Sequence, residues 1–485
     1  MSGPHPFDPY QVFQRSAQRF PERPALRIGE REWSYAELER AAAQVAGWCD
    51  RRTEHGARIA VHGRKGFLAY AGILGVLRSG RSYVPLHPEH PAARWHTVIG
   101  RSHAAACIVE QEQAASFEGI EGLRLMTAID EGGHGPVREG TESYVMFTSG
   151  STGVPKGVAV SRANVAAYLE HFPLRAQFNE HDRFSQVFAL TFDLSVHDLF
   201  LCWSVGACLC VPEAEAALGI PTYIITQGIT VWFSVPSLIT LMHRMRVLRP
   251  NAFEGIRHSF FCGEALSWER SDVWRQAASR STLTNLYGPT EATIAISACT
   301  VGPDRSAGEV NVPLGKVIGH NRMRIADADA NGEGELWLSG PQVTGGYLDA
   351  PETTAQAFVA SGGMTWYRTG DRAVQDAAGE FHFRGRLDDQ VKILGHRVEP
   401  GEVDAVLSRH LPQGTSLTLA VDLKGTTRLV TFIDVAMDTA PLLEELRLEL
   451  PPYMVPERIV PVEGFPLTAH GKVDRKALLQ ALANG

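Results

Sequence analysis

A chain of 485 residues exceeds the size of one compact hydrophobic core, so two or more domains are expected. Hydrophobic and charged fractions of 44% and 21% are those of a soluble globular protein, and a net charge of −8 argues against general binding to nucleic acid or anionic membrane. The seven cysteines form no CxxC pair, which argues against disulfides and zinc. Because the sequence shows no signal-peptide core and no apolar run long enough to cross a bilayer, we expect a cytoplasmic protein.

The N-terminal part of the chain alternates strand and helix patterns. The predicted elements are a hairpin over 25–34, a helix over 36–52 capped by Ser34, a strand over 58–62, a helix over 65–80 ending at a glycine, a strand over 82–86, a helix over 163–172 and a strand over 184–189. This rhythm, repeated to about residue 300, predicts an α/β fold with mostly parallel sheets flanked by helices.

A strand-like apolar run, 144–147, leads directly into a loop rich in Ser, Thr and Gly. Its glycines let the backbone bring N–H groups close to an anion, while hydroxyl groups add donors and a lysine adds positive charge. The loop does not fit the Walker A pattern, but it predicts a triphosphate cradle; a flexible surface loop is the alternative. The candidate phosphate-binding residues are Thr148, Ser149, Gly150, Ser151, Thr152, Gly153 and Lys156.

Asp193 lies in an apolar, helix-forming run. Because a buried carboxylate is costly unless a cation pairs with it, Asp193 is predicted to be either a helix cap or the receptor for a positive group. Three later strand ends, within 231–237, 258–264 and 285–293, break into small or polar residues. Ligands of open α/β sheets collect at the carboxyl ends of strands, so we expect these segments to share one crevice with 148–157.

The character of the chain changes after residue 312 to short β-rich pieces, which predict a small β-barrel-like subdomain over 312–387. The polar segment 387–390 predicts a hinge, and a compact α+β piece follows to residue 485. Lys472 stands behind a glycine just before a predicted helix. By itself, this lysine is typical of a solvated charge rather than of a catalytic group.

Seven segments together resemble the adenylate-forming enzymes, specifically the amino-acid adenylation domains of nonribosomal peptide synthetases and the D-alanine:carrier-protein ligases. These segments are Phe147–Gly157, Phe192–Val196, Tyr287–Thr293, Gly334–Leu338, Tyr367–Asp371, Gly385–Lys392 and Gly471–Lys476. The resemblance implies a large N-terminal domain, 1–387, and a small mobile C-terminal domain, 388–485, with a hinge at Asp388. It also implies two half-reactions: formation of aminoacyl-AMP from ATP, then transfer of the acyl group to a phosphopantetheine thiol.

The resemblance assigns roles to the residues around the nucleotide. Lys472 would bridge the substrate carboxylate and the AMP portion, and Glu291 would ligate Mg²⁺, with Thr290 near the α-phosphate. The nucleoside residues are implied to be Asn285 at the adenine amino edge, Tyr287 stacked on adenine beside Gly288, Asp371 at the ribose hydroxyls with Arg386, and Phe383 where the family often has tyrosine. Preorganised donors and cations of this kind stabilise the charge that develops on transferring phosphates.

Asp193 would pair with the α-ammonium group of an amino acid, which acyl- and aryl-acid activators do not require. The other implied pocket residues are Leu194, His197, Ser237, Phe260, Cys262, Gly263, Leu286, Ile294 and Ala295. Since Asp193 carries the one formal charge in this set, a small neutral side chain is favoured: alanine first, with serine, glycine or proline as alternatives. His197 could instead bond a hydroxyl or a carboxylate, which keeps serine and β-amino acids open.

The chain shows neither a carrier-attachment pattern after Lys472 nor a condensation motif before it, so we expect a stand-alone enzyme with a separate carrier protein. The need for a small activating protein stays open. An acid:CoA ligase and a catalytically inactive nucleotide-sensing member are the alternatives. Departures from the family wording at Arg81, His87, Ser161 and Leu394 lie outside the implied phosphate and Mg²⁺ residues.

Overall fold

A computed structural model describes residues 5–129, 133–150, 154–172, 177–213, 219–302, 305, 309–411, 414–423, 426–467 and 473–484. The chain forms two compact units, which we call the large unit and the small unit. The large unit comprises Met1–Pro88, Ile99–Phe147 and Gly157–Leu387. The small unit comprises Glu89–Val98, Thr148–Lys156 and Asp388–Gly485.

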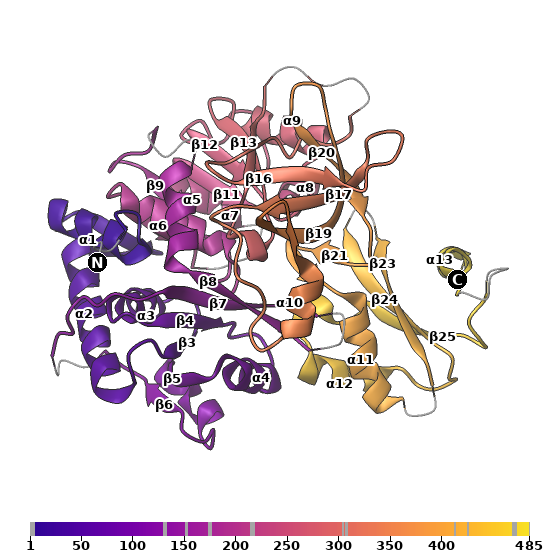
Figure 1. The fold of residues 1–485 in the computed structure, drawn as a ribbon, viewed down its shortest axis with the longest axis horizontal. Coiled ribbons are helices and arrows are strands. Elements are labelled where there is room, and N and C mark those ends of the chain that lie inside the picture. The colour runs from indigo at the N-terminus through magenta and orange to yellow at the C-terminus, as the bar shows by residue number, and fades with distance from the viewer. Residues whose placement is uncertain are drawn as a thin grey trace. The chain divides into compact units, whose positions relative to one another are not determined.

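The larger of two mostly parallel sheets has nine strands (Figure 1). In spatial order they are β15 (Lys316–Val317), β14 (Ser297–Thr300), β13 (Thr282–Tyr287), β12 (His258–Phe261), β11 (Val231–Ser234), β9 (Arg183–Ser185), β10 (Cys208–Val211), β1 (Pro24–Ile28) and β2 (Arg31–Ser34). The six central strands are parallel, and antiparallel strands stand at both edges. The predicted hairpin and the predicted sheet type are therefore confirmed.

The second parallel sheet has six strands. They are β6 (Arg124–Met126), β5 (Ala104–Ile108), β3 (Arg58–His62), β4 (Ser82–Leu86), β7 (Glu142–Thr148) and β8 (Lys156–Ser161). Strands β6, β5, β3, β4 and β7 pair in parallel. A strand of this kind is covered on both faces, so its residues are buried in succession, as they are in β4, where four mostly apolar residues follow Ser82.

Helices cover both faces of the nine-stranded sheet. Neighbouring residues of one strand alternate between the faces: Trp232 and Phe261 pack against α7, α8 and α9, whereas Phe233 and Phe260 belong to the core shared with α1, α5 and α6. The helices between residues 1 and 280, which flank this sheet or the six-stranded one or lie elsewhere, are α1 (Pro9–Arg19), α2 (Tyr35–Arg52), α3 (Phe67–Arg78), α4 (Ala92–Ser102), α5 (Arg162–His171), α6 (Leu194–Ser204), α7 (Ile220–Thr226), α8 (Pro236–Arg244) and α9 (Trp268–Ala277), with a 3₁₀ helix η1 (Gln111–Phe117).

Two predicted helix ends are confirmed at the level of hydrogen bonds. Ser34 caps α2 in a capping box with Glu37, whose side chain reaches back to the Ser34 backbone N–H. Helix α3 begins after Gly66 and ends at Arg78. Gly80 then adopts φ 75°, and the N–H groups of Gly80 and Arg81 return to the last carbonyls of the helix, as in a Schellman motif.

The strand predicted over 184–189 is wrong in length, because β9 covers only Arg183–Ser185. The ammonium group of Lys65 binds the carbonyl oxygens of Gln186 and Val187, at 3.5 and 3.0 Å. Those carbonyls therefore bond a side chain where a longer strand would bond its neighbour.

The β-rich subdomain predicted after residue 312 is an antiparallel sheet of five strands. Its path runs β16 (Arg322–Ala326), β17 (Gly334–Ser339), β19 (Met364–Gln375) and β18 (Phe358–Ser361), while β20 (Phe381–Arg386) pairs with β19. Helix α10 (Pro351–Ala357) precedes β18. The ladder of β19 and β20 brings Asp371 opposite Arg386, which matters for the candidate site.

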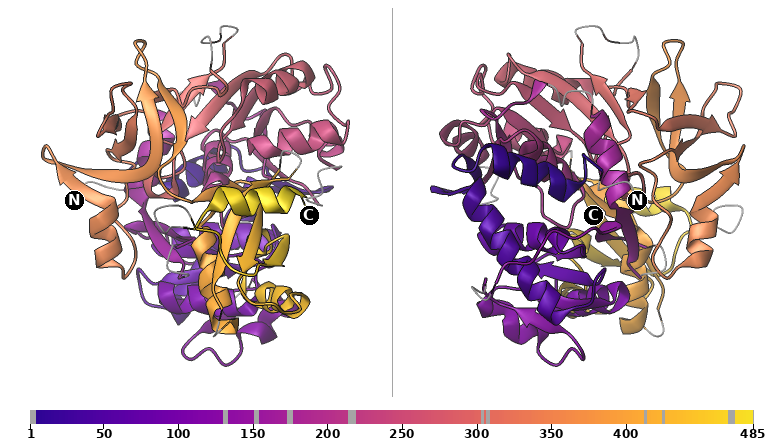
Figure 2. Two further views of the ribbon diagram at one scale, coloured as in Figure 1. Left: turned by 90° about the vertical axis from the view of Figure 1, so that its right-hand side faces the viewer. Right: turned by 60° about the vertical axis from the view of Figure 1, so that its left-hand side comes forward.

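The small unit contains a hairpin, β21 (Val391–Ile393) with β22 (His396–Val398), and a three-stranded sheet. The sheet consists of β23 (Ser416–Asp422), β24 (Thr427–Ile433) and β25 (Arg458–Pro461), accompanied by α11 (Pro400–His410), α12 (Ala440–Glu449), the 3₁₀ helix η5 (Pro452–Met454) and α13 (Arg475–Asn484). One face packs against α11 and α12 and the other against Leu478 of α13. Figure 2 draws these strands and helices in orange to yellow. This is the α+β arrangement that the sequence predicts for this part of the chain.

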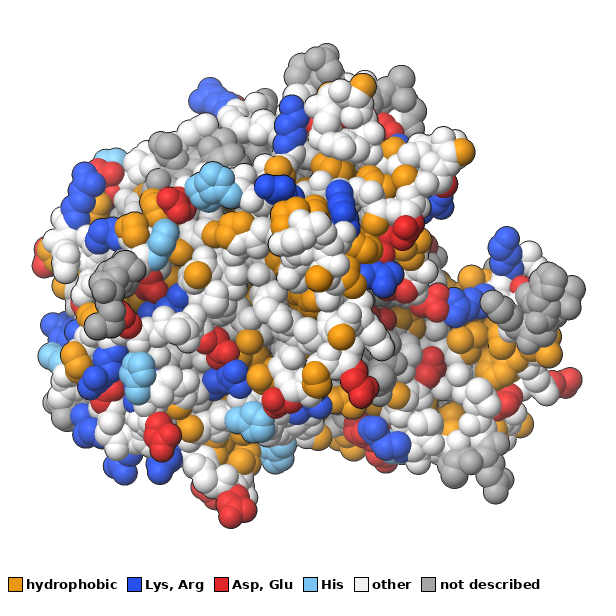
Figure 3. All heavy atoms as spheres, viewed as in Figure 1, with side chains coloured by type: hydrophobic (Ala, Val, Ile, Leu, Met, Phe, Trp, Pro, Cys, Tyr) orange, Lys and Arg blue, Asp and Glu red, His pale blue; other side chains and the backbone are white. Residues whose placement is uncertain are grey.

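The seven cysteines are all buried and free. In the parts of the chain that the structure describes, every helix is too short or too polar to cross a membrane. On the face shown in Figure 3, acidic and basic side chains are interspersed, in keeping with a modest net charge of −8.

Candidate functional site

Asp193 occupies the N-cap position of α6, but its carboxylate does not cap the helix. Its Oδ2 instead accepts a hydrogen bond from the backbone N–H of Ile294, at 3.2 Å. The side chain is buried, and burial raises the pKa of Asp193 to about 7 against the lowering effect of hydrogen bonds from Ile294 and Thr290. Of the two predicted roles, the cap is therefore wrong, and the receptor for a positive group stays a prediction.

The predicted nucleoside residues lie on β13, β19 and β20, and three of them, Tyr287, Asp371 and Arg386, are bonded to one another. The Tyr287 hydroxyl donates to Asp371 Oδ2 at 2.5 Å, and Arg386 Nη1 donates to Asp371 Oδ1 at 2.6 Å. Asn285 donates from Nδ2 to the carbonyl of Pro313 at 2.8 Å. Its Oδ1 is buried without a hydrogen-bond partner among the described residues.

This arrangement fits the nucleoside part of ATP. An acceptor such as Asn285 Oδ1 suits an exocyclic amino group, because a buried oxygen without a partner gains a hydrogen bond on binding. A carboxylate such as Asp371 can accept from two neighbouring hydroxyls. Phe383 lies half-buried on β20 and has no hydroxyl to contribute.

Glu291 is fully buried in the short 3₁₀ helix η4 (Thr290–Ala292), directly after Gly288 and Pro289. Its Oε1 accepts from the Tyr347 hydroxyl at 2.7 Å, and its carbonyl accepts from the Thr344 N–H at 2.9 Å. A carboxylate held in this way fits Mg²⁺, which binds one or two protein carboxylates and takes its other ligands from phosphates and water.

His197, on α6, forms a buried pair with Tyr168 of α5. The Tyr168 hydroxyl lies 2.6 Å from His197 Nδ1, and His197 Nε2 is buried without a partner among the described residues. Burial lowers the pKa of His197 to about 3 and raises that of Tyr168, so both groups are neutral near pH 7. The bond is donated either by the Tyr168 hydroxyl, with the ring proton on Nε2, or by the ring, with the proton on Nδ1.

The remaining predicted pocket residues come from four elements and the segments between them. Most are buried members of one apolar cluster: Leu194, Phe260, Cys262, Leu286, Ile294 and Ala295. Ser237, on α8, donates its backbone N–H to Glu264 at 2.8 Å, and its Oγ is buried without a partner among the described residues. Gly263 follows β12 with φ 89°. The structure thus brings the apolar members together, with polar atoms at Ser237 and His197.

The predicted phosphate loop belongs to the small unit. Ser149 Oγ donates to the carbonyl of Arg397 at 2.8 Å, and the Gly150 N–H donates to Glu402 Oε2 at 3.3 Å. Arg94 Nη1 pairs with the other oxygen of Glu402, at 2.7 Å. A carboxylate therefore binds a loop N–H that the sequence assigns to a phosphate.

Other parts of the predicted phosphate site are only partly described. Thr148 Oγ1 is buried without a partner in the described structure, and Lys156 begins β8. Ser151, Thr152 and Gly153 lie outside the described residues, as does Lys472. Asp388 is the first residue of the C-terminal segment of the small unit, and its Oδ1 accepts from the Gln390 N–H at 3.2 Å.

Three residues at the site were not predicted: Tyr168, Gln342 and Tyr347. Tyr347 follows Gly346 in a segment whose glycines weakly predict a turn. Tyr168 lies in a sequence that is typical of any helix. The partners of Tyr168 and Gln342 are far away in sequence, so a local motif could not have found them.

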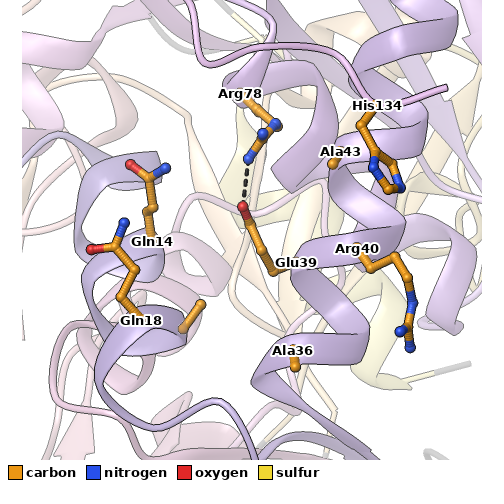
Figure 4. Close-up of a pocket in the computed structure, with 9 residues that line it drawn as sticks. Gln14, Gln18, Ala36, Glu39, Arg40, Ala43, Arg78 and His134 are labelled. Carbon is orange, nitrogen blue, oxygen red and sulfur yellow. Dashed lines mark hydrogen bonds and ion pairs between the residues drawn. The ribbon is translucent and has the colours of Figure 1, made fainter.

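A cavity of about 450 Å³ between α1 and α2 shares no residue with the predicted site (Figure 4). Its lining includes Glu39, which pairs with Arg78 of α3 and accepts from the Tyr10 hydroxyl at 3.0 and 2.9 Å. Burial raises the pKa of Glu39, and Arg78 opposes this effect. These bonds join three helices, so we interpret the polar groups here as structural.

Comparisons with known proteins identify the family of the chain. The family described as AMP-binding enzyme matches residues 13–348. Over 97% of its length the chain is 33% identical to tyrocidine synthase 3 of Brevibacillus parabrevis, of which it spans only 8%. It is 29% identical to the D-alanine--D-alanyl carrier protein ligase of Lacticaseibacillus rhamnosus, covering 96% of this chain and 98% of that protein.

A solved structure is also similar over nearly the whole chain. The adenylation domain AlmE of Vibrio cholerae, in complex with glycyl-adenosine-5'-phosphate, matches with a TM-score of 0.87 and 28% identity, over 99% of this chain and 98% of that one. The family match and these relatives all indicate one family. The chain therefore belongs to the AMP-binding enzymes, as an amino-acid adenylation domain of the peptide-synthetase and carrier-protein-ligase type.

Proposed function

We propose that the protein activates a small neutral amino acid as aminoacyl-AMP, using ATP and Mg²⁺, and transfers it to the phosphopantetheine thiol of a separate carrier protein. Alanine is the substrate that we favour, and the cytoplasm, where ATP is made, is the expected compartment. The roles of the site residues below are part of this proposal.

The observation that carries the proposal is the environment of Asp193. Its carboxylate is buried at the start of α6, and no basic side chain pairs with it among the described residues. The Ile294 N–H and the Thr290 hydroxyl supply neutral donors, which offset only part of the cost of burying a charge. An ammonium group of a substrate would complete this site, because an opposite charge favours the ionised carboxylate.

The rest of the pocket favours a small, neutral side chain. Phe260 and Leu286 fill space with apolar groups, and both are buried. Two relatives fit this size: AlmE is named with a glycyl adenylate, and the Lacticaseibacillus ligase with D-alanine. These names describe those proteins and support, for this chain, a substrate of similar size.

Serine is a second candidate substrate, and two atoms favour it. His197 Nε2 and Ser237 Oγ are both buried without a partner in the described structure. A hydroxyl on the substrate side chain, which can donate and accept, would satisfy such an atom. A carboxylate is disfavoured, because neutral His197 offers no positive charge to it.

In the first half-reaction, a carboxylate oxygen of the amino acid attacks the α-phosphorus of ATP, and the bond to the β-phosphate bridging oxygen breaks to release pyrophosphate. Lys472 would hold the attacking carboxylate against the α-phosphate, and Lys156 would bind the β- and γ-phosphates. Mg²⁺, bound at Glu291, would neutralise charge on the phosphates. Asp371 and Tyr287 would orient the nucleoside, so that the reacting atoms meet in line.

In the second half-reaction, the thiolate sulfur of phosphopantetheine attacks the acyl carbon, AMP leaves with the bonding electron pair, and the thiol proton passes to solvent. We propose that the small unit rotates about Asp388 between the two steps. A separate carrier protein is consistent with the name of the Lacticaseibacillus ligase, whose whole length this chain nearly covers.

The proposal is tested by amino-acid-dependent exchange of labelled pyrophosphate into ATP. The panel should contain both enantiomers of the common amino acids, glycine, β-alanine and matched acids that lack the amino group. We expect the largest exchange rates with alanine or serine, and loss of a carrier-bound product when the phosphopantetheine arm is omitted. Exchange that responds only to acids without an amino group would contradict the proposal and favour an acid:CoA ligase.

A further inference from the structure

We propose that Gln342 is a positioning residue for the amino-acid site, whose carboxamide holds the turn Thr293–Ala295 in the conformation that directs the Ile294 N–H at Asp193. The inference rests on the proposed function in one respect, the role of Asp193 as receptor for the substrate ammonium group. It adds a residue that no motif of the sequence predicts and gives it a defined effect on substrate binding.

The turn is strained by its backbone geometry. Thr293 has φ 55° and Ile294 has φ 70°, and both are β-branched residues, for which positive φ is unfavourable. The Ala295 N–H donates to the Thr293 carbonyl at 2.9 Å. That bond closes a γ-turn of the rare positive-φ form around Ile294, a conformation that persists only where the surroundings hold it.

Gln342 supplies what holds the turn. It is fully buried, and its Nε2 lies 2.7 Å from the carbonyl oxygen of Ala295 and 3.1 Å from that of Thr293. The Ala292 carbonyl lies 3.3 Å from the same nitrogen. In the opposite direction, Thr293 Oγ1 donates to the Gln342 carbonyl at 2.6 Å. The carbonyls on both sides of Ile294 are thus bound to one amide group.

Asn321 fixes which way the Gln342 amide faces. Its Nδ2 donates to Gln342 Oε1 at 2.6 Å, and its Oδ1 accepts from the Gln342 backbone N–H at 3.1 Å. Since Gln342 Oε1 is taken by this donor, the amino group of Gln342 must face the turn. Gly340, with φ 128°, permits the close approach, because a Cβ there would lie 2.6 Å from the Asn321 Cα.

The hydrogen bonds of Gln342 define what its loss would do to the turn. Without Gln342, Ile294 can relax toward negative φ, which turns its N–H away from Asp193 Oδ2 and displaces a wall of the side-chain pocket. The nucleoside residues Tyr287 and Asp371 keep their own bond to each other. The KM for the amino acid should therefore rise while the KM for ATP stays nearly constant.

The test compares Gln342→Met, which preserves length but removes the amide, with Gln375→Met as matched control, since Gln375 is exposed on β19 of the same subdomain. By pyrophosphate exchange, we expect Gln342→Met to raise the amino-acid KM about tenfold or more, from the loss of several buried hydrogen bonds, and the ATP KM less than about twofold. Adding Thr293→Gly, which tolerates positive φ, should return the amino-acid KM to within about threefold of wild type.

Equal rises in both KM values, an unchanged amino-acid KM, or failure of Thr293→Gly to rescue would each overturn the inference. If Gln342→Met does not fold, Asn321→Ala is measured by the same criteria, since Asn321 orients the Gln342 amide. A wild-type protein without amino-acid-dependent exchange would contradict the proposed function instead. Crystal structures would then decide: positive φ kept at Ile294 in Gln342→Met overturns the proposed role of Gln342, and its loss supports it.

Discussion

The amino-acid and nucleoside residues of the large unit differ from the phosphate loop of the small unit in what their polar groups bind. In the large unit, the carboxylates of Asp193 and Asp371 bind Ile294, Tyr287 and Arg386. In the small unit, loop donors at 149–150 bind a carbonyl and a carboxylate, which an incoming phosphate would replace. Under the proposed function, the first set is a preformed binding site, whereas the loop must exchange partners when a phosphate binds.

The largest expected effect tests whether the small unit supplies a catalytic cation. Lys472→Ala should lower amino-acid-dependent pyrophosphate exchange by about 10³-fold, because a positioned charge on a transferring phosphoryl group is lost. Transfer from preformed aminoacyl-AMP to the carrier protein should stay near the wild-type rate. Lys476→Ala, an exposed lysine of α13, is the control. Equal loss of both half-reactions would show that the proposed role of Lys472 is wrong.

The next effect concerns the preformed site. Asp193→Ala should raise the KM for the amino acid by about 10²-fold, because the substrate ammonium group would be desolvated without a partner. The KM for ATP should change by less than about threefold, since the nucleoside residues do not depend on Asp193. Asp349→Asn, at an exposed aspartate, serves as control. A parallel rise in the KM for ATP would indicate general loss of structure.

The same difference explains how far the sequence could predict this molecule. Features that depend on neighbouring residues could be predicted. Ser34 and Glu37 lie three residues apart and form the capping box, and the alternation of strand and helix patterns predicted the parallel sheets. Contacts between residues far apart in the sequence could not be predicted. The Lys65 ammonium group shortens β9 from more than a hundred residues away, and Gln342 reaches a turn 49 residues earlier. These long-range contacts form only once the whole fold is complete. The residues next to Lys65 and Gln342 in the sequence contain no pattern that predicts them.

The sequence likewise limited Asp193 to two roles but could not decide between them. Its position at the start of a helix predicts a cap as well as a receptor, because both need a short acidic side chain. The choice between them depends on Ile294, which lies 101 residues later. For the predicted phosphate loop, the composition alone suggested one role. The hydrogen bond from Gly150 to Glu402 could not be predicted, because Glu402 lies in a sequence typical of any helix with an acidic residue in its first turn.

The pH dependence of the preformed site follows from the pKa of Asp193, raised to about 7 by burial. Below pH 7 the carboxyl is protonated in the free enzyme and cannot pair with an ammonium group. The kcat/KM for the amino acid should therefore rise about tenfold per pH unit up to pH 7 and level off above it. When ATP is the varied substrate, kcat/KM should not show this rise with pH. A flat amino-acid profile would contradict the buried, unpaired state of Asp193.

Stability gives an independent readout of the same group. The folded state keeps the Asp193 proton to about pH 7, whereas the unfolded carboxyl loses it near pH 4, so the free energy of unfolding falls as pH rises between these values. Asp193→Asn removes this loss and should therefore be more stable than wild type at pH 8, by a few kcal/mol at most. Thermal unfolding at pH 5 and pH 8 measures the difference.

A smaller effect is expected at the nucleoside residues. Asp371→Asn should raise the KM for ATP about tenfold, because a charged acceptor of the ribose hydroxyls becomes a neutral amide and the bond to Arg386 weakens. The KM for the amino acid should remain within about twofold. Asp376→Asn, in the turn between β19 and β20, is the control. A selective change in the amino-acid KM would mean that Asp371 belongs to another subsite.

The smallest effect probes the loop that must exchange partners. Glu402 binds the Gly150 N–H and pairs with Arg94, and both groups lie in the small unit. Glu402→Gln keeps the shape but removes the charge that stands where a phosphate would bind, so the KM for ATP should fall about threefold. Glu444→Gln, at an exposed acid of α12, is the control. A rise in the KM for ATP would show instead that Glu402 holds the loop in its binding conformation, and the contrast between the two regions would disappear.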